Sequence, residues 1–213
     1  MSELRLRYQT VEFNHHDIHV RSLRDNQQFS DPMGIAEDLG ISSAQWPLFG
    51  VLWDSGVVLA HFMDNYDTHN KRVLEVGCGI GLSSLLLNQR HDDISATDYH
   101  PDAAVFLQAN TELNHGRDIP FERNDWAEDD STLGTFDLII GSDLLYEVEH
   151  IPLLSTFINR HANTHCDVIV VDPGRGNHAK FSKAMVALGY RHSQHKPDGF
   201  SGQIIQFHRS ASS

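Results

Sequence analysis

The chain has 213 residues, of which 40% are hydrophobic and 21% are charged, and this predicts one globular domain rather than two. Acidic residues outnumber basic ones by 29 to 16, so the formal net charge is −13. This balance argues against a nucleic-acid partner, because such proteins usually present a basic patch that replaces the phosphate counterions. An acidic surface instead favours a cationic partner, such as a lysine-rich protein segment.

The chain carries no evident signal for membrane insertion or secretion. No apolar run approaches the roughly 18 residues of a membrane span, and the first ten residues lack the apolar core of a secretory signal. We therefore expect a cytoplasmic protein without membrane contact, and we expect it to act as a monomer.

The cysteines and histidines predict neither a disulfide framework nor a metal site. Cys78 and Cys166 are the two cysteines, and without a C-x-x-C pair they are expected to be reduced thiols in or near the core. Two histidine pairs have the spacing H-x-x-x-H: His15 with His19, and His161 with His165. That spacing gathers ligands only on a helix, and Ala162 stands where the zinc-protease motif needs Glu. The first pair lies in a turn and strand, and the second straddles an expected helix end.

The first 63 residues predict a hairpin, a loop and one helix. Residues 7–24 alternate apolar and polar side chains around the polar turn N-H-H-D at 14–17, which is typical of two paired strands. The expected inward positions are Val11, Phe13, Ile18 and Val20. Residues 25–45 have no sustained period and contain Asp31-Pro32 and Gly40, so we expect a loop with one short helix. A longer helix is expected from about 55 to 63.

From residue 71 onward, strand-like and helix-like segments alternate. Strands are expected at 72–77, 93–98, 121–124, 136–143 and 167–173, and helices at 82–90, 101–114, 150–162 and 178–188. Several strands are nearly continuous apolar runs, as expected when helices cover both faces of a parallel sheet. Two strand-like pieces joined by Pro197-Asp198-Gly199 predict a C-terminal hairpin and an antiparallel edge. The fold class is therefore α/β: a Rossmann-like, doubly wound, mostly parallel seven-stranded sheet in a single domain, 1–213, with an extension at 1–45 and the core at 46–213.

A glycine-rich turn follows the first core strand. Gly77, Cys78 and Gly79 begin the sequence G-C-G-I-G, and glycine there permits positive φ and close approach of a ligand. Leu82 replaces the third glycine of the dinucleotide fingerprint, so the match to NAD fails. Glu75 precedes the turn, where an acid would repel a pyrophosphate but suits the ammonium and sulfonium of S-adenosylmethionine. Its alternative role is an ion pair at the end of the sheet.

The next two strands end in side chains that suit the remainder of the same ligand. Asp98 would accept hydrogen bonds from ribose hydroxyls, as acids at this position do, or would serve as a helix N-cap. Asp125 and Trp126 follow the third strand, where the Asp125 region would accept from the exocyclic amine and Trp126 would cover the adenine face or join the core. Trp53 is a second candidate to cover the ligand.

Together these motifs give the chain a family resemblance. It resembles the seven-β-strand S-adenosylmethionine-dependent methyltransferases, and more narrowly methyltransferase family 16, which contains many protein-lysine methyltransferases. The matching stretches are W-D-S-G-V-V-L-A from Trp53, L-E-V-G-C-G-I-G from Leu74, A-T-D ending at Asp98, N-D-W at 124–126 and S-D-L-L-Y-E from Ser142. The resemblance implies that Trp53, Glu75, Gly77, Gly79, Asp98, Trp126 and Ser142 line the cofactor. Relatives often carry alanine at the position of Ser142.

The resemblance also implies that D-x-x-Y, here Asp143 and Tyr146, lies beside the target amine. A lysine amine has a reference pKa near about 10.4, so it must lose a proton before it can attack. The sulfonium and desolvation both favour that loss, while Asp143 would hold the remaining N–H bonds and aim the lone pair. Tyr146 would wall the channel and offer its hydroxyl or a cation–π contact. These two residues are the predicted catalytic pair; the alternative is an N-cap acid and a packed tyrosine.

The predicted activity is methyl transfer from S-adenosylmethionine to nitrogen, with S-adenosylhomocysteine as the product and protein lysine as the leading acceptor. Leu144-Leu145 breaks the Pro-Pro motif of enzymes that methylate planar amides and adenine amines. A small amine and protein histidine remain alternative acceptors, and a cofactor-binding interaction module is the non-enzymatic alternative. The stretch V-V-D-P-G-R at 170–175 looks like that of methyltransferases acting on the electron-transfer flavoprotein β subunit, or is simply a tight turn.

Overall fold

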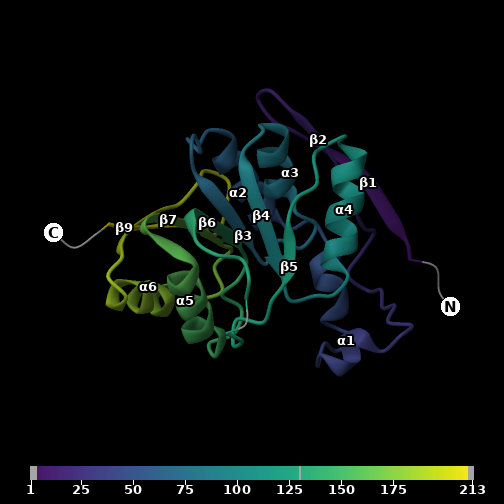
Figure 1. Cartoon of the computed structure of the whole chain (residues 1–213). Coiled ribbons are helices and arrows are strands. Elements are labelled where there is room, and N and C mark those ends of the chain that lie inside the picture. The colour runs from purple at the N-terminus through teal and green to yellow at the C-terminus, as the bar shows by residue number, and fades with distance from the viewer. Residues whose placement is uncertain (1–3, 130, 211–213) are drawn as a thin grey trace.

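A computed structural model describes residues 4–129 and 131–210 as a large mixed sheet, flanking helices and an N-terminal hairpin (Figure 1). The main sheet has seven strands in the order β5-β4-β3-β6-β7-β9-β8, and β1 and β2 form a separate two-stranded sheet. The strands are β1 (Leu6–Glu12), β2 (Asp17–Leu23), β3 (Arg72–Val76), β4 (Asp93–Asp98), β5 (Phe121–Arg123), β6 (Phe136–Ser142), β7 (Ala162–Asp172), β8 (Arg191–His195) and β9 (Gln203–Arg209). The helices are α1 (Ile35–Asp38), η1 (Trp46–Gly50), α2 (Asp54–Asp64), α3 (Leu82–Gln89), α4 (Ala103–Leu113), α5 (His150–His161) and α6 (His178–Ala187).

Both faces of the central strands are buried, which explains their continuous apolar runs. One core cluster joins Leu74, Ile139 and Val168 to residues of α5 and α6. A second cluster, on the other face, joins Val73 and Leu138 to α2. Strands β5, β4, β3, β6 and β7 are mutually parallel, so their carboxyl ends lie at one edge of the sheet. The predicted α/β class and the mostly parallel seven-stranded sheet are confirmed.

The C-terminal hairpin supplies the predicted antiparallel part of the sheet. β9 pairs antiparallel with both β7 and β8, so the last strand inserts between β7 and the edge strand β8. β8 carries exposed polar residues along its whole length, and such residues discourage pairing with another chain at an open edge.

The N-terminal hairpin packs on α4, with two asparagines providing its hydrogen bonds. Asn110 accepts from the amide of Arg21 at 2.7 Å and donates to the Arg21 carbonyl at 3.1 Å. Asn114 accepts from the amide of His19 at 2.8 Å. Of the expected inward positions, Val11, Ile18 and Val20 are buried. Phe13 lies past the end of β1 and is only partly buried.

Two element boundaries differ from the sequence-based expectation by more than one residue. Helix α4 begins at Ala103 rather than Pro101, because the His100 ring accepts the Asp102 amide at 3.1 Å and so holds a turn ahead of the helix. Strand β7 begins at Ala162, directly after α5, because Ala162 pairs with Phe136 across a register shift.

One apolar segment qualifies the expectation that no stretch reaches the length of a membrane span. Trp46–Asp64 is long and apolar enough by length and composition alone, and 44% of its most apolar window is buried in the fold. The segment comprises η1 and α2, separated by residues 51–53 without helix. Leu59, Ala60 and Met63 are fully buried, so this part of the segment belongs to the protein core.

Candidate cofactor and acceptor site

The predicted site residues collect at the carboxyl edge of the parallel strands. Val76 at the end of β3 pairs with Thr97 of β4 and with Gly141 of β6. The loops that follow these three strands therefore begin side by side. Glycine-rich residues 77–81, which we call the glycine loop, follow β3, and the segment 143–146, which we call the acceptor segment, follows β6.

The glycine loop needs its glycines for two reasons. Gly77 and Gly79 have φ of 62° and 54°, a region that side chains other than Asn and Asp rarely enter. A Cβ on Gly79 would lie 2.8 Å from the Phe49 carbonyl oxygen, and one on Gly77 would lie 2.5 Å from Leu144 Cδ2. Leu144 therefore packs the acceptor segment directly against the glycine loop. Between the glycines, Cys78 is buried, and burial raises its pKa well above the ordinary value, so the thiol is neutral.

Glu75 is a buried carboxylate held by the start of α3. Its Oε2 accepts from the Ser84 amide at 2.9 Å and from the Ser84 hydroxyl. Burial raises the pKa of Glu75 to about 7, and the neighbouring Asp98 also raises it, while the bonds from Ser84 lower it. The Glu75 side chain is therefore held in place by Ser84, and its protonation state changes near neutral pH.

Asp98 fastens the glycine loop to the end of β4. One carboxylate oxygen accepts from the Gly79 amide at 2.8 Å, and the other accepts from the His100 amide at 2.9 Å. Burial raises the pKa of Asp98, and these backbone bonds lower it. Each oxygen keeps a second lone pair, so the predicted contact with ribose hydroxyls is compatible with this arrangement.

Trp53 and Ser142 both lie near the start of α2. Trp53 is the N-cap residue of α2, and its indole N–H donates to the Leu48 carbonyl at 2.9 Å. Ser142 ends β6, and a Cβ built on Gly56 would lie 3.6 Å from the Ser142 hydroxyl. The first turn of α2 therefore approaches the end of β6, beside the glycine loop.

The segment after β5 contributes a turn and an aromatic wall. Asp125 accepts the Ala127 amide at 2.9 Å, so its side chain shapes the turn. Trp126 packs against the core under α5 and meets the ring of His150 edge-on at 5.7 Å. Asn124, just before them, is buried, and its Oδ1 has no partner among the described residues. This side-chain oxygen lies close to Asp98, because the backbone N–H of Asn124 donates to the backbone carbonyl of Asp98.

The acceptor segment is held in an uncommon backbone conformation. Asp143 has φ of 55°, and its amide donates to the Val171 carbonyl at 2.9 Å. The Leu145 carbonyl accepts from the Asn177 side chain at 2.9 Å. The loops that follow β6 and β7 are therefore bonded to each other, which offsets the cost of the left-handed backbone.

Asp143 is paired with an arginine from the loop after β7. Arg175 Nε lies 2.6 Å from Asp143 Oδ1, and a second guanidinium nitrogen lies 2.8 Å from Oδ2. The Asp143 side chain is 14% exposed and that of Arg175 is 44% exposed. Charge-assisted bidentate pairs of this kind are among the strongest side-chain contacts.

Tyr146 belongs to a row of rings beside that pair. Its ring meets His150 edge-on at 5.3 Å, and His150 in turn meets Trp126. The Tyr146 side chain is about half exposed, at 49%. Partial burial, together with Glu147, Asp98 and Asp143, raises the pKa of Tyr146 to about 12, so the phenol stays neutral and acts only through hydrogen bonds and its ring.

Three further residues join the site in the structure without being predicted from the sequence: Arg175, His150 and Asn177. The turn D-P-G-R was visible, but nothing in one sequence shows that its arginine reaches Asp143, 32 positions earlier. His150 stands four residues after Tyr146, a spacing that brings side chains together on a helix, although α5 starts only at His150. Asn177 is a polar residue at a helix start, which by itself predicts an N-cap.

Comparison with known proteins agrees with this geometry. Residues 28–186 match the protein family described as lysine methyltransferases, and the chain belongs to that family. Protein N-lysine methyltransferase METTL21A of Danio rerio is 35% identical over 123 residues, which are 53% of this chain and 56% of that protein. The electron transfer flavoprotein beta subunit lysine methyltransferase of Xenopus laevis is 30% identical over 140 residues, 64% of this chain and 55% of that protein. The matched regions thus span little more than half the length of these relatives.

A solved structure reproduces nearly the whole fold. The ribosomal protein L11 methylase of Lactobacillus delbrueckii covers 96% of this chain and 100% of its own, with a TM-score of 0.66 at 17% identity. The predicted family is confirmed by the family match. The residues present fit S-adenosylmethionine: the glycine loop has no room for a Cβ, Glu75 and Asp98 suit a cationic, hydroxyl-bearing ligand, and Asn124 keeps a buried acceptor.

Proposed function

We propose that this protein is an S-adenosylmethionine-dependent methyltransferase that acts on a lysine amine of a protein. The observation that carries the proposal is the position of Asp143 and Tyr146 beside the glycine loop, with Leu144 between them packed on Gly77. Family membership and the printed names of the relatives support lysine as the acceptor.

The cofactor would be held by the carboxyl edge of β3, β4, β5 and β6. The glycine loop would admit it close to the backbone, Glu75 would face its cationic end, and Asp98 would accept from its ribose. Trp53, Asp125, Trp126 and Ser142 would complete the lining. When bound, it supplies a methyl group that the acceptor nitrogen takes as the sulfur–carbon bond breaks, with the bonding electrons left on sulfur.

Asp143 and Tyr146 would orient the acceptor. A lysine amine has a reference pKa of about 10.4, so it must release one proton to water before its lone pair is free. Asp143 would accept a remaining N–H, and the Tyr146 hydroxyl would accept or donate alongside it. Holding the nitrogen in line in this way lowers the entropic part of the barrier.

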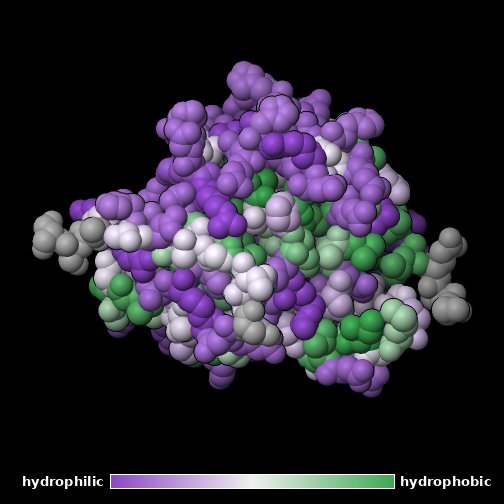
Figure 2. Space-filling model, viewed as in Figure 1, coloured by the Kyte–Doolittle hydropathy of each residue, from purple (hydrophilic) through white to green (hydrophobic). Residues whose placement is uncertain are grey.

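The surface around the site suits a protein substrate. Residues 29–48 carry four exposed large hydrophobic side chains: Phe29, Met33, Ile35 and Leu48. Figure 2 shows hydrophobic surface at the lower right, where Figure 1 places α1. Tyr146, in the acceptor segment, and Val148, two residues after it, add exposed apolar surface. A basic, partly apolar segment that contains lysine would complement this surface and the net charge of −13.

A methyl-labelling experiment tests the proposal. Protein incubated with S-adenosylmethionine labelled in its methyl group and a cell lysate should label one or a few protein bands, with the label on lysine after hydrolysis. Label on histidine or in the low-mass fraction would instead support the alternative acceptors. Cofactor binding without any transfer would support the interaction module.

Asp143→Asn tests the acceptor role directly. Asparagine tolerates the left-handed φ of this position, so the change removes the charge with little backbone strain. We expect at least a hundredfold loss of transfer, with cofactor affinity within about threefold of wild type because the carboxylate is not part of the glycine loop. Exposed Asp118→Asn is the matched control. Full activity of Asp143→Asn would contradict the assignment.

A further inference from the structure

Arg175 forms an ion pair with Asp143, the carboxylate that is proposed to orient the acceptor amine. Both carboxylate oxygens of Asp143 are engaged by the guanidinium. The charge of Asp143 is therefore balanced by Arg175 when an acceptor amine reaches it. Each carboxylate oxygen still has a lone pair that can accept a hydrogen bond from the amine. Lysine would not reproduce this contact, because only arginine offers a planar fork that matches a carboxylate.

The loop that carries Arg175 is built to present it. Asp172, fully buried at the end of β7, accepts the Gly174 amide at 3.1 Å and so fixes the turn. Gly174 and Gly176 flank the arginine with φ of 102° and 84°, and a Cβ on either would meet open space. Glycine is favoured at these two positions because of the positive φ, and not because a side chain would clash with neighbouring atoms. Asn177 then ties the end of the loop to the Leu145 carbonyl.

We propose that Arg175 is a positioning residue for the acceptor, one that holds the Asp143 carboxylate and cancels its charge, so that the amine bound there loses its proton more readily. This inference rests on the proposed function. It accounts for an otherwise unfavourable feature, because an unpaired carboxylate beside an ammonium stabilises the protonated form and opposes its loss of a proton.

The sign of the effect follows from the charges around the site. Arginine remains charged at every accessible pH, so the Asp143–Arg175 pair has no net charge. The groups next to it are the carboxylate of Asp172 and the neutral phenol of Tyr146. Behind them lie Glu147, Asp98 and His150 around Tyr146, and His178, whose Nδ1 lies 3.9 Å from Asp172. With Arg175 removed, the charge of Asp143 is no longer cancelled, so the site becomes more negative by one charge and the ammonium form of the acceptor is favoured.

A contrasting role predicts the opposite result. If the guanidinium merely occupied the place of the substrate amine, each substrate would have to displace it. Removal of Arg175 would then increase kcat/KM and leave the pH profile unchanged. The two roles are therefore separated by the direction of one measurement.

The test compares Arg175→Gln and Arg175→Lys with wild type. The measurement is the rate of methyl transfer, from pH 6.5 to 10, to the lysate protein that the labelling experiment identifies. For Arg175→Gln we expect the midpoint of the increase in kcat with pH to shift to a higher pH, by about one pH unit. At pH 7.5 we therefore expect kcat to fall about tenfold. For Arg175→Lys, which keeps the charge and loses the fork, we expect a lower kcat on a nearly unshifted profile. Arg191→Gln, at an exposed position of β8, is the matched control.

The further readouts assign the cause of any failure. Calorimetric cofactor affinity should stay near wild type in each variant, because the hydrogen bonds of the Arg175 side chain go to Asp143 and not to the glycine loop. The midpoint of thermal unfolding shows whether each variant is folded at the assay temperature. An unshifted profile in Arg175→Gln, or a gain in kcat/KM, would overturn the positioning role while the proposed function stands. No transfer by wild type would overturn the proposed function and this inference with it.

Discussion

Glu75 is a buried carboxylate whose protonation is expected to control cofactor affinity. Burial raises its pKa to about 7 in the free protein, whereas a cation bound nearby would favour the charged form and lower that pKa. The affinity for S-adenosylmethionine should therefore be greatest above pH 7 and weaken as pH falls, by up to about tenfold per unit. Calorimetric titrations between pH 5 and 7 check this, a range in which the amino group of the ligand stays protonated.

Glu75→Gln is the matched control for that dependence. The amide keeps the shape of the side chain and does not titrate, so its cofactor affinity should be lower at pH 7 and flat between pH 5 and 7. A slope equal to that of wild type would mean that another group, such as Asp98, is responsible.

At the scale of residues, the sequence allows candidate site residues to be predicted, but not the residues with which they form hydrogen bonds or ion pairs. Glu75, Asp98, Asp143 and Tyr146 stand out because acids and a phenol at strand ends are conspicuous after apolar runs. The partner of Asp143 was not predictable, since the guanidinium reaches it only because the loops after β6 and β7 are bonded to each other. Whether the predicted residues hold cofactor and substrate stays a prediction, which the variants above address.

At the scale of elements, Asn110 links the N-terminal hairpin, α4 and the glycine loop. Its side chain bonds the amide and carbonyl of Arg21 and also the Ile80 carbonyl at 3.1 Å. Asn110→Ala would leave these buried backbone groups without partners, so we expect the free energy of unfolding to fall by about 2–4 kcal/mol. Urea denaturation measures the loss. Because the Ile80 carbonyl lies in the glycine loop, cofactor affinity should weaken as well.

Gln108→Ala is the control on the same helix. Gln108 is exposed, and its side chain donates to the exposed Glu112 side chain, so its loss should change the unfolding free energy by less than about 0.5 kcal/mol. Equal effects of the two substitutions would mean that the Asn110 bonds contribute nothing beyond helix propensity.

Periodicity predicted the elements because burial repeats along each of them. Asn110 itself lies in the buried register of α4, with Ala103, Phe106, Leu107 and Thr111, so a polar residue on the apolar face was visible from the sequence. Its partners were not, because they depend on how the hairpin folds back across 89 positions. The same limit explains the start of α4, which is shifted because the Asp102 amide donates to the His100 ring.

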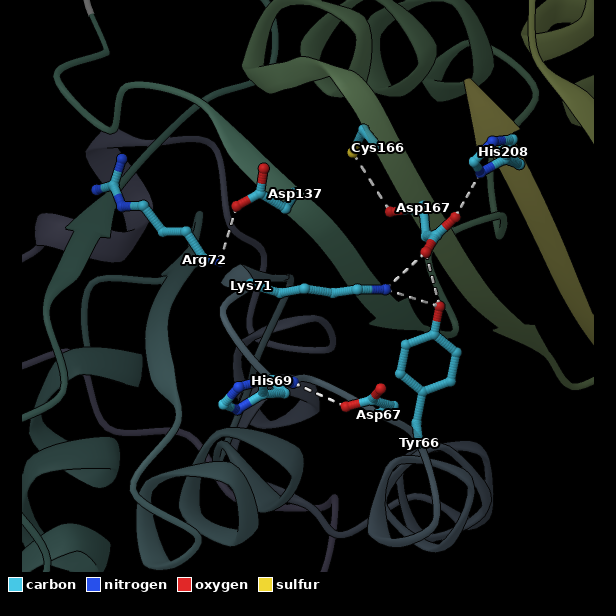
Figure 3. A network of polar contacts seen from close by, with 9 residues as sticks. All are labelled: Tyr66, Asp67, His69, Lys71, Arg72, Asp137, Cys166, Asp167 and His208. Carbon is cyan, nitrogen blue, oxygen red and sulfur yellow. Dashed lines mark hydrogen bonds and ion pairs between the residues drawn. The ribbon is translucent and has the colours of Figure 1, made fainter. Parts of the chain in front are cut away.

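At the scale of the whole molecule, a polar network joins distant parts of the chain, as Figure 3 shows. Asp167 of β7 accepts from Tyr66 at 2.9 Å and from Lys71 at 2.8 Å, and its other oxygen lies 2.7 Å from His208 of β9. Lys71 directly precedes β3, and Asp167 lies several residues before the end of β7. The network is therefore at the opposite edge of the sheet from the glycine loop, where it can stabilise the fold without touching the site.

We expect Asp167→Asn to lower the free energy of unfolding by about 1–3 kcal/mol at pH 7, because it leaves Lys71 without its anion. Burial alone would raise the pKa of Asp167, but hydrogen bonds from Lys71, His208 and Tyr66 lower it below its ordinary value. A depressed carboxyl pKa stabilises the folded state above the unfolded pKa of about 3.9, and this contribution is lost as pH falls through the lower folded value. The gap between wild type and variant should thus stay constant from pH 7 to about pH 5 and narrow only as pH falls below about 3.9 in urea titrations, while Asp118→Asn shows no gap. Cofactor affinity at pH 7 should be unchanged, and a large loss of it in Asp167→Asn would mean that the two edges of the sheet are coupled.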